Sequence, residues 1–496
     1  MAGLGAAILS GLLLWASFPP IGFGVLAFIA PVPLLWAIRH CESAFTALMY
    51  GWVTGAVYFG LLLFWISELG MVAWLPLTLY QATTMGVLSL VLWLFKLWPE
   101  RRWWFITIGL WVGLEILRSY FPFGGFPWGA IGYATAGLPG AIGSVQWIGP
   151  AGWSALTIGV AAGIVLLIEE KSQWQYVVDS SVAVIILITA GSFFGPSPQG
   201  PLINVAIIQG GSPCPQVHCQ NENQRIYDSH LALTRGLPDL SVELVVWPEN
   251  SSGPPVSPLD NDTARDEITA EAARLGAYLL VSGTLTLSPE EFRNFNVMYA
   301  PGGNLVGIYD KRHPVPFGEF VPMRELLSFI PQLDQVPRDM KRGSDPVVFQ
   351  TLFGGIGSVI SFEGAFSRYM REEALEGAQL MIVATNESSF GPGPASDQLL
   401  GLTRVNAAAV GQDLVHAAIT GKSAFVQADG TVIGETDLLT EEVLVGAVRL
   451  RTGPRTLFTL LGEWFGALSM LAAIVAFLIP GKDRPQRRSS VARTSR

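Results

Sequence analysis

The sequence predicts a multi-pass α-helical membrane domain joined to a water-exposed α/β domain. Half of the 496 residues are apolar and only 14% are charged, whereas soluble domains have roughly 25% charged residues. The apolar residues are unevenly distributed along the chain. Residues 1–197 and 456–480 are almost continuously hydrophobic, and residues 200–452 have the composition of a soluble domain. We therefore expect two kinds of domain in one chain.

Eight stretches have the composition of membrane helices, which need about 20 apolar residues each. Seven precede the α/β domain and one follows it, at residues 3–18, 22–38, 46–66, 71–95, 103–118, 148–168, 179–196 and 456–480. The first is short enough to resemble a secretion signal. No basic residue precedes it, and the "SFPPIGFG" that follows is a poor cleavage site, so we expect it to remain as a span.

The basic residues of the short loops predict the orientation in the cell membrane. Alternate loops and the C-terminal tail carry Arg39, Lys96, Arg101, Arg102, Lys171, Lys482, Arg484, Arg487, Arg488, Arg493 and Arg496. The short loops on the other side carry only Arg118. Because Lys and Arg concentrate in cytoplasmic loops, the α/β domain is expected on the non-cytoplasmic side. The basic tail, residues 481–496, is then a cytoplasmic anchor at anionic lipid, and we expect no nucleic-acid partner.

Short β-rich runs alternate with helical patterns in the α/β domain. The predicted strands are residues 203–209, 244–249, 277–283, 295–300, 355–361, 379–386, 415–420 and 423–428, and the clearest helical patterns are 261–276 and 368–378. Strands spaced by helices and hairpins predict a layered α/β fold with mixed sheets. In such folds ligands bind at the carboxyl ends of the strands.

Polar residues cluster at these predicted strand ends. They are Glu249, Lys311 and Glu319 in the Pro-rich loop 309–322, Ser361 with Glu363, and Asn386 with Glu387. Each alone is more commonly a solvated or capping residue, but four such places in one domain indicate a site. Acyl transfer would need a general base such as Glu249, a cation such as Lys311 for the oxyanion, and a nucleophile.

The cysteines favour no metal site. Cys214 and Cys219 lie in "SPCPQVHCQ", on the predicted external side, where a disulfide is permitted. With His218 they are two ligands short of the usual zinc patterns. A local disulfide or two free thiols remain the alternatives, and we expect no metal and no other cofactor.

Four motifs together carry a family resemblance. They are the strand-end Glu249, the loop "YDKRHPVPFGEFVP" (309–322), the strand-end "SFE" (361–363) and "TNESSFG" (385–391). With "LRSYFPFGGFPWGAIGYA" (117–134), they resemble the carbon–nitrogen hydrolase (nitrilase) superfamily, and within it the apolipoprotein N-acyltransferase family. The resemblance covers nearly the whole chain. It implies a nitrilase-like αββα sandwich outside the cytoplasm.

The resemblance also implies the roles of site residues. Glu249 matches the family's base and Lys311 its lysine, and Ser361 stands where the family has a nucleophilic cysteine. Supporting positions fall on Glu319, Phe362, Glu363 and Asn386. A serine hydroxyl is a weaker acid than a thiol, so Ser361 depends more heavily on a well-placed base.

The implied reaction transfers a phospholipid acyl chain, through an acyl-enzyme, to the N-terminal amine of the diacylglyceryl-cysteine of apolipoproteins. The implied partners are a phospholipid donor, a diacylglyceryl lipoprotein acceptor and membrane lipid. Two alternatives remain open: a catalytically impaired paralogue that binds lipid or lipoprotein, and a membrane-tethered amidase. The loop "FGGFPWG" either lines a lipid entry groove or forms an interfacial aromatic belt. Glu115 and Arg118 are expected to form a paired structural anchor.

Overall fold

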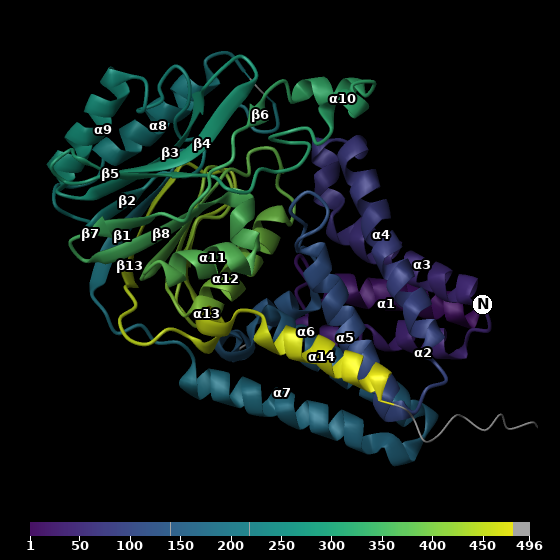
Figure 1. The fold of residues 1–496 in the computed structure, drawn as a ribbon. Helices are drawn as coiled ribbons and strands as arrows, with labels where there is room; N and C mark the ends of the chain where they lie inside the picture. The colour runs from purple at the N-terminus through teal and green to yellow at the C-terminus, as the bar shows by residue number, and fades with distance from the viewer. Residues whose placement is uncertain (139, 218, 480–496) are drawn as a thin grey trace, which may run out of the picture.

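The computed structural model describes residues 1–138, 140–217 and 219–479. A helical domain and a two-sheet domain lie against each other (Figure 1). The predicted basic tail, 481–496, and His218 lie outside the described residues.

The helical domain consists of long apolar helices joined by short turns. Its elements are α1 (Ala2–Ala16), η1 (Gly24–Phe28), α2 (Val32–His40), α3 (Ala44–Leu62), η2 (Phe64–Leu69), α4 (Met71–Leu94), α5 (Glu100–Arg118), η3 (Ile131–Gly137), α6 (Ala141–Glu169), η4 (Lys171–Gln173), α7 (Trp174–Phe194), α13 (Leu457–Leu461) and α14 (Trp464–Leu478). In the described part of the chain, four helical segments are long and apolar enough to cross a membrane: Ala44–Leu62, Met71–Leu94, Ala141–Glu169 and Lys171–Phe194. The number of spans in the membrane stays a prediction.

Several predicted spans differ from the observed helices. The span predicted at 22–38 is divided into η1 and α2, and the helix of the span predicted at 46–66 ends at Leu62. Two further spans are interrupted at a glycine. The helix predicted at 148–168 begins earlier, at Ala141, and is kinked at Gly149, where φ is +69°. The stretch predicted at 456–480 is divided into α13 and α14 by Gly462, where φ is +63°. Both interruptions occur at a glycine because the left-handed backbone conformation costs little without a Cβ atom.

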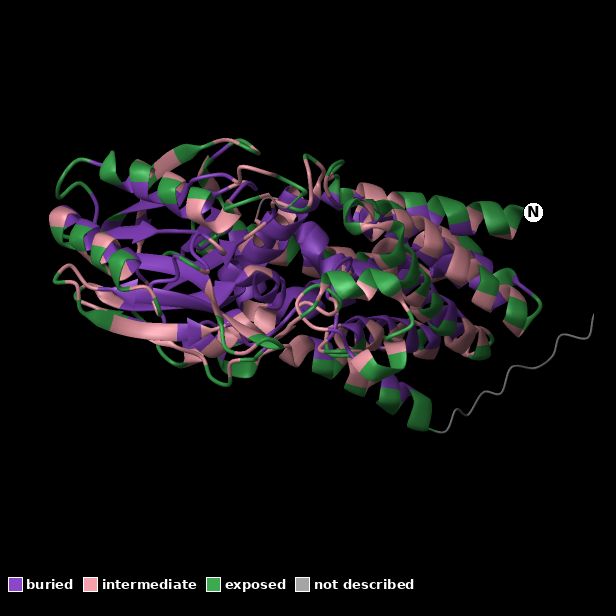
Figure 2. Ribbon diagram, turned by 90° about the horizontal axis from the view of Figure 1, so that it is seen from above, coloured by how far each residue is buried: buried purple, intermediate pink, exposed green. Residues whose placement is uncertain are grey.

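Small residues allow the membrane helices to pack closely. A Cβ atom at Gly51 of α3 would lie only 2.4 Å from the Met85 carbonyl oxygen of α4, and one at Gly55 would lie 2.7 Å from Ala82 Cα. Lipid provides little hydrophobic drive for helix association, so close backbone contact of this kind is an important source of stability. Figure 2 shows exposed positions along the outward faces of these helices. On α4 these include the apolar Leu75 and Val87, as expected for a surface in contact with lipid.

The second domain contains two sheets. The first has the order β13-β1-β2-β3-β4-β5, with β6 paired to β4, and the second has the order β12-β11-β10-β9-β8-β7. The strands are β1 (Leu202–Gln209), β2 (Leu244–Val246), β3 (Tyr278–Thr286), β4 (Glu291–Tyr299), β5 (Leu305–Asp310), β6 (Asp339–Met340), β7 (Val348–Thr351), β8 (Gly354–Ile360), β9 (Leu380–Thr385), β10 (Leu414–Ala418), β11 (Ala424–Val426), β12 (Val432–Glu435) and β13 (Glu442–Arg449).

Helices cover both outer faces of the two sheets. Helices α8 (Glu222–Arg235) and α9 (Asp262–Leu275) pack on the first sheet, and α11 (Ser367–Leu375) and α12 (Ala395–Val410) pack on the second. Apolar side chains from both sheets fill the space between them. This is an αββα sandwich, so the predicted fold class is confirmed. The core under α11 and α12 continues into the helical domain, and Figure 1 shows these two helices between the sheets and the bundle.

Parallel strands bring the predicted site residues to one region. Strands β1, β2 and β3 are parallel neighbours, as are β8, β9 and β10. Glu249 follows β2, Ser361 follows β8 and Asn386 follows β9. The strands predicted to end at Glu249 and Ser361 stop at Val246 and Ile360 instead. Glu249 and Ser361 therefore lie just beyond the observed strand ends.

Candidate active site

A buried lysine joins two carboxylates at the centre of the candidate site. Lys311 Nζ lies 3.0 Å from Glu249 Oε1 and 2.6 Å from Glu319 Oε1. The lysine side chain is 1% exposed and that of Glu249 is 4% exposed. Burial alone lowers the pKa of Lys311, but the two carboxylates outweigh it and raise that pKa above its usual value. Lys311 is therefore a cation at neutral pH and is suited to stabilise developing negative charge.

Two asparagines orient the Glu249 carboxylate. Asn294 Nδ2 of β4 donates to Glu249 Oε1 at 2.7 Å, and the backbone N–H of Asn386 donates to Oε2 at 2.8 Å. Asn386 was among the predicted supporting residues, and it acts here through its main chain. Asn294 was not predicted, because it lies within a strand and not at its end.

Ser361 occupies a strained turn directly after β8. It is the first residue of η6 (Ser361–Ala365), and its φ is +51°. Left-handed conformations are uncommon for residues other than glycine and often mark functional positions. Nucleophiles at the tip of a sharp strand-to-helix turn have this kind of backbone.

The Ser361 hydroxyl is connected to the β9 strand end. Thr385 Oγ1 donates to Ser361 Oγ at 3.3 Å, and Thr385 directly precedes Asn386. Within the described ranges, no hydrogen bond joins Ser361 Oγ to Glu249 or Lys311. The structure thus joins Asn386, Glu249, Lys311 and Glu319 in one chain of contacts, and links Ser361 to this chain through Thr385, the neighbour of Asn386.

Glu363 ties the segment of Ser361 to the segment of Lys311. Its Oε1 accepts the backbone N–H groups of Arg312 and His313, at 2.6 and 2.9 Å. Its Oε2 accepts from Tyr309 Oη and from the Ile360 N–H, at 2.7 and 2.8 Å. Burial raises the pKa of Glu363, against the opposing effect of these hydrogen bonds. The supporting role of Glu363 stays a prediction, and this bridge is the contact that would serve it.

Phe362 connects the candidate site to the helical domain through aromatic contacts. Its ring lies 6.0 Å from that of Trp128, with an angle of 16° between the planes, and 5.9 Å from that of Phe126. Both partners belong to the "FGGFPWG" loop after α5. Phe123 of the same loop contacts Phe317 of the loop that carries Lys311. Part of this aromatic loop therefore packs against the candidate nucleophile segment.

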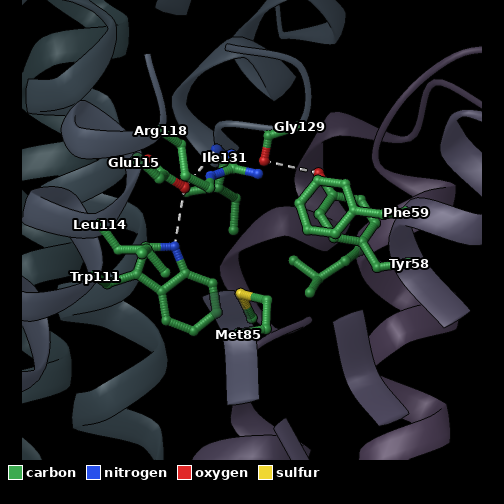
Figure 3. Close-up of a pocket in the computed structure, with 10 residues that line it drawn as sticks. Tyr58, Phe59, Met85, Trp111, Leu114, Glu115, Arg118, Gly129 and Ile131 are labelled. Carbon is green, nitrogen blue, oxygen red and sulfur yellow. Dashed lines mark hydrogen bonds between the residues drawn. The ribbon is translucent and has the colours of Figure 1, made fainter. Parts of the chain in front are cut away.

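Glu115 and Arg118 hold this loop in place (Figure 3). Glu115 Oε1 accepts from Trp111 Nε1 and from the Ile131 N–H, both at 2.9 Å. Arg118 donates to Gln81 Oε1 at 2.7 Å and to the Trp128 carbonyl at 3.3 Å. The predicted pairing of Glu115 with Arg118 is not observed, since no ion pair joins them within the described chain. Each side chain instead binds backbone in or just after the loop, Arg118 at Trp128 and Glu115 at Ile131. The cavity beside them has a volume of only about 10 Å³, room for no more than one water molecule.

Cys214 and Cys219 form a disulfide, and Cys41 is a buried free thiol. This resolves the choice between a local disulfide and two free thiols. Among the described residues, no group of three or more His, Cys, Asp or Glu side chains is arranged to hold a metal ion.

Family models match both domains of the chain. An apolipoprotein N-acyltransferase N-terminal domain matches residues 10–163, and a carbon–nitrogen hydrolase domain matches residues 204–454. An apolipoprotein N-acyltransferase from Geobacter metallireducens is 31% identical, over 95% of this chain and 94% of its own. The chain belongs to the apolipoprotein N-acyltransferase family. The resemblance seen in the sequence is thereby confirmed.

Other members of the apolipoprotein N-acyltransferase family also align over most of their length. The protein from Gloeobacter violaceus is 28% identical over 98% of this chain and 96% of its own, and the protein from Mycolicibacterium smegmatis is 28% identical over 96% and 85%. Among solved structures, an amidase from Nesterenkonia sp. is 19% identical with a TM-score of 0.39, covering 51% of this chain and 92% of that one.

Proposed function

We propose that this chain transfers a phospholipid acyl chain to the N-terminal amine of the diacylglyceryl-cysteine of apolipoproteins, with Ser361 as nucleophile. The observations that carry the proposal are the buried Lys311 between Glu249 and Glu319, and the strained turn of Ser361, whose hydroxyl contacts Thr385 directly before Asn386. Relatives named apolipoprotein N-acyltransferase supply the reaction class. The site supplies a base, a cation and a hydroxyl, which are the groups that acyl transfer requires.

The first half-reaction would form an ester with the enzyme. The Glu249 carboxylate takes the proton of the Ser361 hydroxyl as Oγ attacks the ester carbonyl of the phospholipid. Lys311 stabilises the negative charge on the carbonyl oxygen of the tetrahedral intermediate. The intermediate breaks its bond to the glycerol oxygen, which takes the proton back from Glu249. A lysophospholipid leaves and the acyl chain remains on Ser361.

In the second half-reaction, the acyl-enzyme would be the acyl donor and Ser361 Oγ the leaving group. The amine of the acceptor attacks the carbonyl of the acyl-enzyme, and Glu249 takes a proton from the attacking nitrogen. The bond to Ser361 Oγ breaks, and Oγ receives that proton. The product is an amide, which is more stable than the ester it replaces. Its formation therefore drives the transfer from an ester donor to an amine acceptor.

The contacts of Glu249 support its proposed role as the base. Glu249 is buried and oriented by Asn294 and Asn386, which hold its carboxylate in one position. We further propose that residues 200–452 lie on the non-cytoplasmic side. Both ends of that domain connect to apolar helices, which holds the site at the membrane surface where both lipid substrates reside.

The proposal is tested by trapping the acyl-enzyme. Purified protein in detergent is supplied with a phospholipid that carries an alkyne-tagged acyl chain, and covalent tag is measured in wild type, Ser361→Ala and Ser361→Cys. Ser257→Ala is the matched control, because Ser257 is a buried serine of the same domain. Addition of a diacylglyceryl-cysteine peptide then tests discharge to the acceptor.

The outcomes separate the three hypotheses. Tag on wild type and Ser257→Ala but not on Ser361→Ala, with discharge to the peptide amine, supports the N-acyltransferase. Tag only on Ser361→Cys indicates a site that is catalytically inactive because it has a serine in place of a cysteine. This outcome favours a lipid- or lipoprotein-binding paralogue. Absence of lipid-derived tag together with hydrolysis of small amides favours the membrane-tethered amidase.

A further inference from the structure

One buried glutamine of the α/β domain has its side chain inserted among groups of the helical domain. Gln398 of α12 is 4% exposed. Its Oε1 accepts from Trp65 Nε1 at 3.0 Å and from Trp128 Nε1 at 2.9 Å. Its Nε2 donates to the carbonyls of Pro19 and Leu62, at 3.0 and 3.1 Å. Both acceptor sites and both donor hydrogens of this amide are therefore used.

The four partners come from separate parts of the helical domain. Leu62 is the last residue of α3, so its carbonyl is one of those that a helix leaves without an internal partner at its C-terminus. Pro19 follows α1, Trp65 lies in η2 and Trp128 lies in the loop after α5. A single side chain of α12 thus fixes the ends of several membrane helices relative to the α/β domain.

Both indoles held by Gln398 reach the candidate active site. Trp128 stacks on Phe362, the residue directly after Ser361. Trp65 packs edge-on against Phe390 with 4.7 Å between ring centroids. Phe390 belongs to the segment that follows Asn386, and its N–H donates to the Glu387 carbonyl. The two indoles therefore contact both the nucleophile segment and the segment that orients Glu249.

We propose that Gln398 is a positioning residue for the acyl transfer, acting through Trp128 and Trp65 on the segments that carry Ser361 and Asn386. This inference rests on the proposed function for its consequence, although the geometry it describes is independent of the reaction. The strained turn at Ser361 needs its surroundings to hold it, and the stacked ring of Trp128 is one of those surroundings. Gln398 fixes where that ring lies.

Removing the glutamine amide should release both indoles. Gln398→Leu keeps a side chain of similar size but leaves two indole N–H groups and two carbonyls buried without partners. The N–H groups then reorient toward water or other acceptors, and the carbonyls toward water or other donors, because burial without a hydrogen bond is costly. Gln209→Leu is the matched control. Gln209 is also fully buried, and its amide also binds two donors and two carbonyls, but it does so among β10–β13 segments with no contact to Trp65 or Trp128.

The test measures the position of residue 361 without relying on acyl transfer. In a Ser361→Cys background, the rate of alkylation of the introduced thiol by iodoacetamide is followed by mass spectrometry of its peptide. We expect Gln398→Leu to slow alkylation by about tenfold. This is the rate factor that corresponds to the free energy of about one hydrogen bond. Gln209→Leu should leave the rate within about twofold of the background, since its amide contacts neither indole.

A milder pair of variants covers the case in which Gln398→Leu does not fold. Gln398→Asn shortens the side chain by one methylene, so the amide cannot reach all four partners, and Gln209→Asn is its control. An unchanged alkylation rate in the folded Gln398 variants, or an equal change in the Gln209 variants, would overturn the positioning role. A slowed rate in the Gln398 variants alone, in a protein whose wild type forms no acyl-enzyme, would uphold positioning and reject the proposed function.

Discussion

Glu363 Oε1 accepts a 2.6 Å hydrogen bond from the backbone N–H of Arg312, the residue directly after Lys311. The same carboxylate accepts the N–H of Ile360, the residue directly before Ser361. One buried side chain therefore sets the distance between the lysine and the candidate nucleophile. The spacing Ser361-x-Glu363 in the sequence has this bridge as its physical reason.

Glu363→Gln is expected to destabilise the fold and to abolish acyl-enzyme formation. A glutamine has one acceptor oxygen, so its amino group would face two of the four donors that the carboxylate now satisfies. Leaving buried donors unpaired costs about 3 kcal/mol in total. Thermal unfolding and the alkyne-phospholipid assay measure the two effects. Glu372→Gln is the control, because Glu372 is 43% exposed and the buried Arg312 keeps a second partner in Glu373, so the expected loss of stability is smaller than for Glu363→Gln.

Lys311→Met is expected to leave two carboxylates facing each other without a cation. We expect the unfolding free energy to fall by about 3–5 kcal/mol, the usual cost of breaking a buried ion pair from one side. Adding Glu249→Gln should restore part of that loss, because one charge is then removed. Neither variant should form an acyl-enzyme. A double variant no more stable than Lys311→Met would contradict the assigned ion pair.

Local sequence was sufficient to predict the residues at strand ends. Glu249, Ser361 and Asn386 follow short apolar runs, and parallel neighbours bring such ends together. Lys311 was found because its Pro-rich loop excludes a helix. Asn294 escaped prediction, since it lies inside β4 and joins the site only through the pairing of that strand with β3. Thr385, the last residue of β9, lies in the quoted motif 385–391 but was assigned no role of its own.

The sequence does not predict contacts between distant residues, half-exposed strands or a fully buried helix. Nothing local links Gln398 to Trp128, which are separated by 270 residues. Strand β12 (Val432–Glu435) alternates between intermediate and exposed positions, so it lacks the apolar run of a buried strand. Helix α12 (Ala395–Val410) is buried on nearly every side, which removes the 3.6-residue periodicity that reveals a surface helix.

Acid is expected to weaken the fold through His313. Burial, together with the positive charges of Arg368, Lys311 and Arg342, lowers the pKa of His313 to about 3. The unfolded chain binds a proton at this residue below about pH 6.5 while the folded chain does not, so stability falls as pH falls, by about 1.4 kcal/mol per unit. Between pH 6.5 and pH 5 the contribution is about 2 kcal/mol.

Thermal unfolding of wild type and His313→Phe at pH 7 and pH 5 checks this expectation. The phenylalanine variant keeps an aromatic ring against Phe362 and Phe366 but cannot titrate. Its stability should therefore fall less between the two pH values than that of wild type. An equal decrease in both proteins would show that other groups, and not His313, cause the acid sensitivity.

Reduction of the Cys214–Cys219 disulfide is expected to slow acyl-enzyme formation a few-fold. Gln216, within the closed loop, donates its backbone N–H to the Ser388 carbonyl at 2.9 Å and its Nε2 to Glu68 Oε2 at 3.0 Å. The loop thus joins the helical domain to the segment after Asn386. Opening a loop of this size also costs about 2 kcal/mol of stability.

Reductant titration of wild type and of the Cys214→Ser, Cys219→Ser double variant measures this effect. Because residue 361 is a serine, reductant has no nucleophilic thiol to act on in the proposed site. Wild type should become a few-fold slower on reduction, and the double variant should be slow already and insensitive to reductant. Gln216→Ala distinguishes the effect of the hydrogen bond to Glu68 from the effect of the disulfide, since it removes the hydrogen bond while the disulfide remains. Full activity of the reduced wild type would mean that the loop holds its position without the covalent link.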